Sequence, residues 1–582
     1  MNVFADFRVT VVAALEAMAA DGSLPAGLDT KNVAVEPPRD PAHGDLATNA
    51  AMVLAKPAKM KPREIAEALA AKLADDPMVE TAEVAGPGFL NLRVSSDLWR
   101  RVLRSALAQG VAFGRSEAGG GKRVNVEYVS ANPTGPLHVG HTRGAVFGDA
   151  LASLLDFTGW EVTREYYIND GGAQIDTVAR SAYWRYREAH GEAVEIPAGL
   201  YPGDYLVPVG AALKEEFGDS LLHEPEEVWL PKLREPVTER MMAMIREDLA
   251  ALGVEMDVYY SEKSLYGTGR IEAALESLRE KGLIYEGVLE PPKGKKPEDW
   301  EPREQTLFRS TDFGDDADRP VKKSDGAWTY FAPDIAYHFD KIERGFDLLI
   351  DILGADHGGY VKRMKAAVAA LSAERVPLDI KLCQLVKLFK NGEEFKMSKR
   401  AGTFVTLRDV LDEVGPDVTR FMMLMRKNDA PFDFDLDKAL EQSKDNPVWY
   451  VQYAHARIAS MMRTAAEQYG AGKVTDDALA ALDISALDHP EQIALAKKLA
   501  EWPRLVETAA TTLEPHRIAF YLYELAGELN AHYTKAREIP ELKFLQGEEA
   551  ADLRRLALAR AVGVTLATGL NILGVTAVEE MR

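Results

Sequence analysis

Residues 124–141 read VNVEYVSANPTGPLHVGH. The apolar run from Val124 to Ser130 predicts a strand, the following Asn-Pro-Thr-Gly predicts a turn, and the residues from His138 onwards predict a helix that runs towards Gly159. At the first turn of such a helix, unpaired backbone N–H groups and the positive end of the helix dipole face an anion. The stretch therefore predicts a phosphate-binding site in an α/β fold.

A second segment, Lys396-Met397-Ser398-Lys399-Arg400, places two lysines and an arginine in a polar stretch. A lysine ammonium is a compact charge on a flexible stem, so it can follow the β- and γ-phosphates of a nucleotide as pyrophosphate departs. Together the two segments predict ATP-dependent adenylation. The expected catalytic residues are His138, His141, Lys396 and Lys399.

Each motif alone has a simpler explanation. Two histidines three residues apart can be half of a zinc site or part of a solvated helix face. A Lys-Met-Ser-Lys segment is more often a surface run of charge. The order of the motifs and the sequence around them favour the nucleotide site.

Two carboxylates indicate the second substrate. Glu127 lies on the predicted strand, and Asp334 belongs to the segment Tyr330-Phe331-Ala332-Pro333-Asp334-Ile335-Ala336-Tyr337. A strand carboxylate is costly to bury unless a cation meets it. A guanidinium binds carboxylates through a planar fork of donors, and Tyr330 could flank that plane. The pair therefore favours arginine, although a structural salt bridge to an arginine of the chain remains an alternative.

A further apolar strand, Leu348 to Leu353, ends at Gly354-Ala355-Asp356-His357. Ligands of open α/β sheets bind at the carboxyl ends of parallel strands. We therefore expect this strand end and the one before the histidines to border one crevice.

These motifs resemble those of a known family. Residues 130–141 resemble the first nucleotide motif of the class I aminoacyl-tRNA synthetases, and KMSKR resembles their second motif, usually KMSKS. The E-x-x-x-x-N pattern from Glu127, the Y-x-x-x-D-I-A-Y pattern from Tyr330 and the closing Leu570 to Val575 resemble bacterial arginyl-tRNA synthetases over nearly the whole chain. The resemblance implies that ATP activates L-arginine to arginyl-adenylate, and that arginine then passes to the 3′-terminal adenosine of tRNA(Arg). It also implies initial attack by the 2′-OH and tRNA binding before activation.

The resemblance also assigns roles to residues. It implies that Glu127 and Asp334 bind the guanidinium, that Tyr330 packs on the side chain, and that Ser130 with Asn132 anchors the amino-acid end. Its ATP-binding residues are His138, Gly140, His141, Gly354, Asp356, His357, Met397 and Lys399.

The expected fold class is α/β multidomain. Residues 117–437 should form a Rossmann-like parallel-sheet catalytic domain, interrupted by an insertion at about 185–325, and Gly119-Gly120-Gly121 marks its start. By resemblance, residues 1–116 form an α+β domain that recognises the tRNA D-loop, and 438–582 form an all-α anticodon-binding domain.

Two groups of residues are the expected tRNA contacts. Phe89 and Asn91 match an aromatic-x-amide pair that reads a D-loop base, whereas Tyr450, Tyr453 and Arg457 match a helix face that meets the anticodon loop. Core packing is the alternative explanation for both groups. The formal net charge of −22 argues against a generally basic RNA surface, so stacking and local patches should hold the tRNA.

Composition sets the remaining expectations. The chain of 582 residues has one cysteine, Cys383, in the apolar run Ile380 to Leu388, which fits a buried thiol and a reducing cytoplasm. Val9 to Ala20 could pass for a signal peptide, but apolar residues at helical spacing indicate an amphipathic helix. We expect a cytoplasmic monomer without membrane association, with ATP as cosubstrate, Mg²⁺ accompanying it and no structural metal.

Two functional alternatives remain. A non-catalytic tRNA-binding paralogue would keep the fold but lose the reaction, which the intact motifs argue against. Cysteinyl or glutamyl specificity on the same fold is disfavoured by the lack of zinc-ligand cysteines and by the paired acids, respectively.

Overall fold

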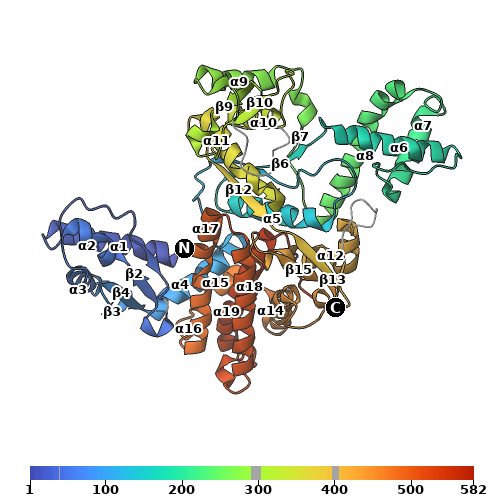
Figure 1. The fold of residues 1–582 in the computed structure, drawn as a ribbon. Coiled ribbons are helices and arrows are strands. Elements are labelled where there is room, and N and C mark those ends of the chain that lie inside the picture. Colours follow the sequence, from blue (N-terminus) through green and yellow to red (C-terminus); the bar gives the residue numbers. More distant parts are fainter. Residues whose placement is uncertain (39, 290–302, 396–404, 582) are drawn as a thin grey trace.

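The computed structural model describes residues 1–38, 40–289, 303–395 and 405–581. A parallel-sheet domain lies against the C-terminal helices, and the N-terminal domain lies to one side of them (Figure 1). The expected multidomain α/β architecture is confirmed.

The central sheet has five strands in the order β12-β11-β5-β6-β7, and every neighbouring pair is parallel. Parallel sheets are buried on both faces, which explains the continuous apolar runs in the sequence. The strands are β5 (Arg123–Glu127), β6 (Glu161–Ile168), β7 (Val258–Ser261), β11 (Leu348–Gly354) and β12 (Leu378–Cys383).

Helices cover both faces of this sheet. On one face, α5 (Val139–Phe157) shares a hydrophobic core with Val124, Val126 and Ile350. On the other face, α10 (Phe331–Glu343) and α11 (Val361–Ser372) pack on a second core that includes Leu349. Because side chains alternate along a strand, the polar residues between these apolar positions face α10.

The predicted strand Val124 to Ser130 is too long by three residues. β5 ends at Glu127, and Val129 and Ser130 adopt left-handed backbone conformations with φ of 69° and 39°. A β-branched residue rarely adopts such a conformation, which costs about 1–2 kcal/mol. The Asn169 side chain holds this turn by donating to the Ser130 carbonyl at 3.0 Å.

The insertion predicted at about 185–325 is not continuous, which corrects the sequence analysis. A first excursion, with a core of its own, leads back to β7, a strand of the central sheet. A second excursion forms an antiparallel sheet of order β10-β9-β8. Their elements are α6 (Ala173–Ala189), α7 (Val207–Phe217) and α8 (Glu226–Leu252), then α9 (Arg270–Glu280), β8 (Ile284–Gly287), β9 (Gln305–Phe308) and β10 (Arg319–Lys322).

The N-terminal domain has an antiparallel sheet of order β1-β2-β4-β3. The helix predicted near the N-terminus is present, and it buries Phe4, Phe7, Val11, Leu15 and Met18 at the expected spacing. The elements are α1 (Val3–Ala20), β1 (Val35–Glu36), β2 (Leu46–Thr48), α2 (Ala50–Ala58), α3 (Pro62–Leu73), β3 (Val79–Ala85) and β4 (Phe89–Val94).

The C-terminal part is helical, as predicted, and α4 (Ser96–Gln109) packs against three of its helices, α15, α16 and α19. A small sheet of order β14-β13-β15 connects it to the central domain. The elements are β13 (Val386–Lys390), β14 (Glu393–Phe395), α12 (Leu407–Leu424), β15 (Phe432–Asp435), α13 (Leu436–Ala439), α14 (Pro447–Tyr469), α15 (Asp476–Ala480), α16 (Pro490–Ala500), α17 (Trp502–Thr512), α18 (His516–Lys535) and α19 (Glu549–Ile572).

One buried arginine joins the central domain to the C-terminal helices. The guanidinium of Arg420, on α12, donates to the Asp149 carboxylate of α5 at 2.5 Å and to the carbonyls of Leu573 and Leu252 at 2.9 and 3.2 Å. Gly574 makes room for it, because a Cβ there would lie 2.2 Å from the guanidinium. Four helices, α5, α8, α12 and α19, are thereby fixed relative to one another.

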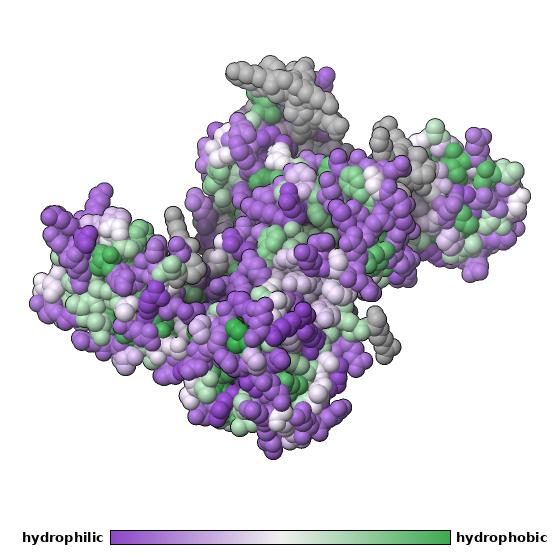
Figure 2. Space-filling view, turned by 90° about the horizontal axis from the view of Figure 1, so that it is seen from below, coloured by the Kyte–Doolittle hydropathy of each residue, from purple (hydrophilic) through white to green (hydrophobic). Residues whose placement is uncertain are grey.

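Hydrophilic side chains cover most of the face shown in Figure 2, and its hydrophobic areas are small and scattered. Within the described part of the chain, no helix has both the length and the apolar character needed to cross a membrane.

Replacing Arg420 by leucine should lower the free energy of unfolding by about 3–5 kcal/mol, because the buried Asp149 would keep only the more distant Arg164, at 3.6 Å, as a cation. Urea denaturation followed by circular dichroism measures this. Arg279→Ala is the matched control, since its partner Glu276 is exposed and the pair contributes less than about 1 kcal/mol. Equal stability of the two variants would contradict the anchoring role of Arg420.

Candidate active site

Three carboxylates form a row across the middle of the sheet. The strand register places Asp351 beside Glu127 and Glu127 beside Glu165, on β11, β5 and β6. All three are buried, and each bonds a side chain of α10 or of Arg344 directly after it. Such a row can be buried only where cations meet it.

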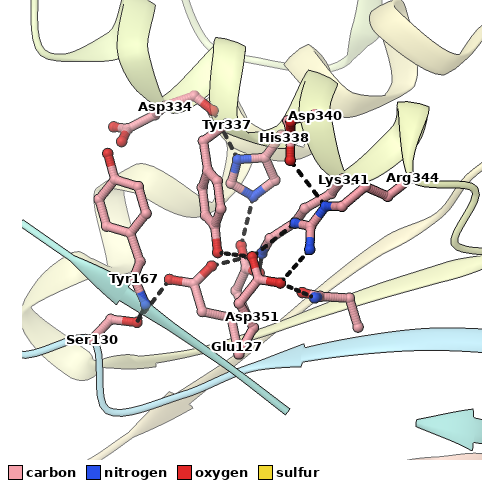
Figure 3. A network of polar contacts seen from close by, with 12 residues as sticks. Glu127, Ser130, Tyr167, Asp334, Tyr337, His338, Asp340, Lys341, Arg344 and Asp351 are labelled. Carbon is pink, nitrogen blue, oxygen red and sulfur yellow. Dashed lines mark hydrogen bonds and ion pairs between the residues drawn. The ribbon is translucent and has the colours of Figure 1, made fainter. Parts of the chain in front are cut away.

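Helix α10 and the residue that follows it supply these cations (Figure 3). The fully buried Lys341 ammonium lies 2.6 Å from Glu127 and 3.0 Å from Asp351, and the Arg344 guanidinium binds Glu165 through two nitrogens at 2.6 and 2.8 Å. Burial opposes ionisation of both Glu165 and Asp351. The attached cations nevertheless lower the pKa of each below its ordinary value.

Glu127 therefore already has a cation. This matches the structural salt bridge that the sequence left open as an alternative, except that the partner is a lysine and not an arginine. Its Oε2 accepts from Lys341, and its Oε1 accepts from the Ser130 hydroxyl at 2.9 Å. The same Ser130 oxygen accepts from the backbone N–H of Tyr167 at 3.1 Å. The carboxylate thus fixes the end of β5 and the left-handed turn after it.

The charges around Asp334, in the first turn of α10, raise its pKa, whereas those around Glu165 and Asp351 lower theirs. Its burial raises its pKa well above the ordinary value, and the charges of Glu262, Glu127 and Asp351 raise it further, against the lowering effect of Arg363. The Tyr360 hydroxyl donates to its carboxylate. The field at Asp334 is therefore negative and favours the arrival of a cation.

Tyr167 borders the same space. Figure 3 shows its hydroxyl pointing towards Asp334. Among the described residues, this buried hydroxyl has no hydrogen-bond partner. Burial raises the pKa of Tyr167 far above its ordinary value, as do the neighbouring charges of Asp334, Glu262 and Glu127. A buried polar atom without a partner, surrounded by acids, is typical of a site completed by a cationic ligand.

The sequence analysis missed Glu262, which directly follows strand β7. Burial raises its pKa, although hydrogen bonds from Tyr266 and the Gly171 backbone lower it. It is the charge that most raises the pKa of Asp334. In the sequence, the short run Val258 to Ser261 could have indicated a strand that ends just before Glu262. This run falls inside the predicted insertion and was not assigned to the central sheet.

The two histidines of the first motif cap helix α5. The Nδ1 of His138 accepts from the Gly140 backbone at 3.0 Å, and the Nδ1 of His141 accepts from the His138 backbone at 3.3 Å. The rings stack with centroids 3.8 Å apart. Since each Nδ1 is an acceptor, the proton of each neutral ring lies on Nε2. A Cβ at Gly140 would lie 2.8 Å from the His138 ring, which explains the glycine between the histidines.

These histidines border a cavity of about 590 Å³ at the carboxyl ends of β5 and β11. Both strand ends line it, so the predicted common crevice is present. Loop residues of the first excursion, Tyr201 and Tyr205, line it from the other side. The predicted residues that border this cavity are Ser130, Asn132, His138, Gly140, His141, Gly354, Asp356 and His357.

Of the predicted residues, Glu127, Asp334 and Tyr330 do not border this cavity. Tyr330 is 78% exposed at the start of α10. Asn132 donates to the Gln174 side chain at 2.7 Å. The predicted residues Lys396, Met397 and Lys399 lie outside the described part of the chain. Leu407 lies beside the histidine motif, since its backbone N–H donates to the Leu137 carbonyl at 2.7 Å.

A further missed residue is Arg143, two residues after His141 on α5. Its buried guanidinium donates to the carbonyls of Gln384, Ala430 and Lys427 at 3.1, 2.7 and 2.8 Å. These contacts hold the loop after β12, which forms one wall of the cavity.

The two groups of expected tRNA contacts lie in the outer domains. Phe89, which is 44% exposed, and Asn91 line a separate cavity of about 400 Å³ in the N-terminal domain. Tyr450, Tyr453 and Arg457 are half-buried on α14. Tyr453 stacks on Trp449, and the Arg457 guanidinium lies 3.4 Å from the centre of the Tyr533 ring. Both groups pack partly within the protein and still present side-chain surface.

Comparison with known proteins identifies relatives along the whole chain. Family profiles match residues 6–94 (Arginyl tRNA synthetase N terminal domain), 102–196 (tRNA synthetases class I (R), catalytic domain) and 451–581 (DALR anticodon binding domain). The chain is 70% identical to the arginine–tRNA ligase of Cereibacter sphaeroides and 69% identical to that of Ruegeria pomeroyi, with 100% of each chain covered in both comparisons. The arginyl-tRNA synthetase structure of Thermus thermophilus shares the fold with a TM-score of 0.72, over 99% of this chain and 100% of that one, at 24% identity.

The single cysteine should be unreactive in the folded protein. Burial raises the pKa of Cys383 to about 12, so the reactive thiolate is about 1,000-fold rarer at pH 8 than for an ordinary cysteine. Labelling with a thiol-specific disulfide reagent should therefore be slow in the native protein and fast in urea. Equal rates in the two states would show that the thiol is not held in this buried position.

Proposed function

The chain belongs to the arginyl-tRNA synthetase family and is an arginine–tRNA ligase, and we propose that the cavity at the carboxyl ends of β5 and β11 is its site of arginine activation. Its relatives match over their full length as ligases, which disfavours the alternative of a non-catalytic tRNA-binding paralogue. The observation that carries the location is the negative space between Asp334, Glu262 and Tyr167. This space adjoins the cavity at Ser130, which lines the cavity and whose hydroxyl oxygen accepts from the Tyr167 backbone N–H.

In this proposal the guanidinium of arginine binds Asp334 and Glu262, and the Tyr167 hydroxyl completes its partners. The raised pKa values of both acids support this choice, because a bound cation relieves the cost of their ionisation. Glu127 acts differently from the role expected on sequence. Paired with Lys341, it orients Ser130 beside the amino-acid end of the substrate.

Tyr330 and Asn132 keep the roles expected for them. Tyr330 is one helical turn before Asp334, so its ring can close over the guanidinium once the ligand is present. Asn132 borders the cavity on the Ser130 side, where the α-amino and carboxylate groups would lie.

Adenylation in this cavity is a displacement at the α-phosphorus of ATP. A carboxylate oxygen of arginine forms a bond to this phosphorus while the bond to the pyrophosphate oxygen breaks. The Nε2–H groups of His138 and His141 donate to phosphate oxygens, and Lys396 and Lys399 take up the growing charge on pyrophosphate. Gly354, Asp356, His357 and Met397 form the nucleoside side. The terminal adenosine hydroxyl of tRNA then attacks the carbonyl of the adenylate, and AMP leaves.

The outer domains supply the proposed tRNA contacts. The cavity lined by Phe89 and Asn91 suits an unstacked base of the D-loop, since one wall is aromatic and the other offers an amide. Tyr450, Tyr453 and Arg457 would meet the anticodon loop. Stacking on these rings needs no basic surface, which fits a chain with a formal charge of −22.

We also propose that the enzyme acts as a monomer in the cytoplasm, since one chain carries every residue assigned above. Mg²⁺ is expected to arrive with ATP, bound to its phosphates. The described residues contain no cluster of three His, Cys, Asp or Glu side chains that could hold a metal ion.

The function is tested by aminoacylation of bulk tRNA with each amino acid in turn, together with ATP–pyrophosphate exchange in the presence of tRNA. Charging of arginine alone supports the proposal. Charging of another amino acid with arginine inert would overturn the substrate. Binding of tRNA without exchange would indicate the paralogue.

Asp334→Asn and Glu262→Gln should each raise the KM for arginine by about 100-fold while the KM for ATP stays unchanged. Glu276→Gln, at an exposed glutamate on α9, is the matched control.

Glu127→Gln should instead lower the midpoint of urea denaturation, because Lys341 loses a partner. A large rise in the KM for arginine for Glu127→Gln, with none for Glu262→Gln, would show that Glu127 and Asp334 bind the guanidinium, as the sequence analysis expected.

Arginine binding should weaken as the pH falls. The raised pKa of Asp334 means that its carboxyl takes up a proton at a pH where an ordinary aspartate, with a pKa of about 3.9, is still ionised. The bound guanidinium favours the ionised form, so binding at such a pH must release this proton. Titration calorimetry in buffers of different ionisation enthalpy measures the release. Asp334→Asn should reduce it to the share of Glu262, whose pKa is also raised. A proton count of zero for both proteins at every pH would contradict the assignment.

A further inference from the structure

We propose that His338 carries a positive charge in the folded enzyme and acts as a positioning residue that holds Asp334 for arginine. The proposal rests on the role of Asp334 proposed above, and it adds a residue that touches neither substrate. Three observations support it, each from the buried network in Figure 3.

Both ring nitrogens of His338 face oxygen atoms that can only accept. Nδ1 lies 2.8 Å from the backbone carbonyl oxygen of Asp334, and Nε2 lies 2.9 Å from the Asp351 carboxylate. A neutral imidazole has one N–H and one lone pair. In either neutral tautomer, one lone pair would point at an oxygen lone pair across less than 3 Å. Only the imidazolium donates to both oxygens.

A proton on the Asp351 carboxyl would be the other way to avoid two lone pairs facing each other between Asp351 and His338. That proton is disfavoured, because the second oxygen of Asp351 lies 3.0 Å from the Lys341 ammonium. Lys341 and His338 together lower the pKa of Asp351, although burial opposes its ionisation. The proton therefore belongs on His338.

The sum of the charges in the network also favours a protonated His338. The row of Asp351, Glu127 and Glu165 has three negative charges, and Lys341 and Arg344 supply two positive ones. An imidazolium at position 338 makes the buried set neutral. Burial of a residual charge would cost several kcal/mol. Of the other acids on α10, Asp340 is balanced by Arg270, and Glu343 is exposed. Asp334 lies outside this count, because the arginine substrate is proposed to meet its charge.

The charged histidine links the strand to the turn that carries Asp334. His338 lies one helical turn after Asp334, and its two N–H groups bridge the Asp334 carbonyl on α10 and the Asp351 carboxylate in the middle of β11. Its ring also lies edge-on to Tyr337, whose hydroxyl donates to Glu165 at 2.7 Å. Loss of the charge would release one of the two bonds. The first turn of α10 could then shift relative to β11, and Asp334 would shift with it.

The first test separates positioning from general stability. His338→Gln, which cannot donate to both oxygens, should raise the KM for arginine by about 10-fold while kcat and the KM for ATP change less than about twofold. His532→Gln is the matched control. His532 is equally buried and its ring bonds one carbonyl, that of Leu542, at 3.1 Å in the C-terminal helices. An unchanged arginine KM, or equal losses in kcat and both KM values, would overturn the positioning role.

The second test needs no variant. Neutron diffraction from deuterium-exchanged crystals of the wild-type enzyme at neutral pH should show deuterium on both Nδ1 and Nε2 of His338. His532 is the internal reference, because burial lowers its pKa and it should carry deuterium on Nε2 alone. A single deuterium on His338, or deuterium on Asp351, would overturn the proposal even if His338→Gln fails to fold.

These outcomes can be distinguished from failure of the proposed function. If Asp334→Asn leaves the arginine KM unchanged, the role of Asp334 is wrong, and the kinetic part of the present proposal falls with it. If Asp334→Asn raises that KM and His338→Gln does not, only the role of His338 is wrong.

Discussion

The row of three acids across the central sheet is the constraint on which the site depends. Asp351, Glu127 and Glu165 lie side by side on neighbouring parallel strands, buried beneath a helix. Such a row is tolerated only if cations reach it in the right register. Lys341 on α10 and Arg344 directly after it meet this need, three residues apart and therefore on one face of the helix. The position of α10 over the sheet is thus set by charge as well as by apolar packing.

This arrangement divides the acids of the site into two kinds. The acids of the row are neutralised by side chains of the protein itself, which lower the pKa of Asp351 and Glu165. Asp334 and Glu262 lie beyond the row, and their pKa values are raised. Acids of the second kind gain most from an arriving cation. The same helix that carries Lys341 to the row carries Asp334 in its first turn, so folding of the network also positions the acid that we propose to bind arginine.

On the histidine side of the cavity, too, the same residues serve the fold and border the cavity. His138 and His141 satisfy backbone N–H groups of the first turn of α5 through Nδ1, and this fixes the proton of the neutral ring on Nε2. The left-handed turn at Val129 and Ser130 lets the chain leave the strand early and reach this helix. Ser130 is held there by Glu127. The residues that fix the local backbone are therefore the same residues that face the ligand, or lie directly behind those that do.

The sequence alone determined the local features that need only neighbouring residues. The helix start at HVGH, the parallel sheet, the helical C-terminal part and the nucleotide crevice all follow from patterns a few residues long. Tertiary structure decided which acid meets which cation. Lys341 is 214 positions from Glu127 in sequence, and no periodicity in the chain marks their pairing. Likewise Glu262 joined the site only because β7 returns to the central sheet after a long excursion. Electrostatic pairing acts through space at a few ångströms, so the folded arrangement, and not the spacing along the chain, selects the acids that remain for the substrate.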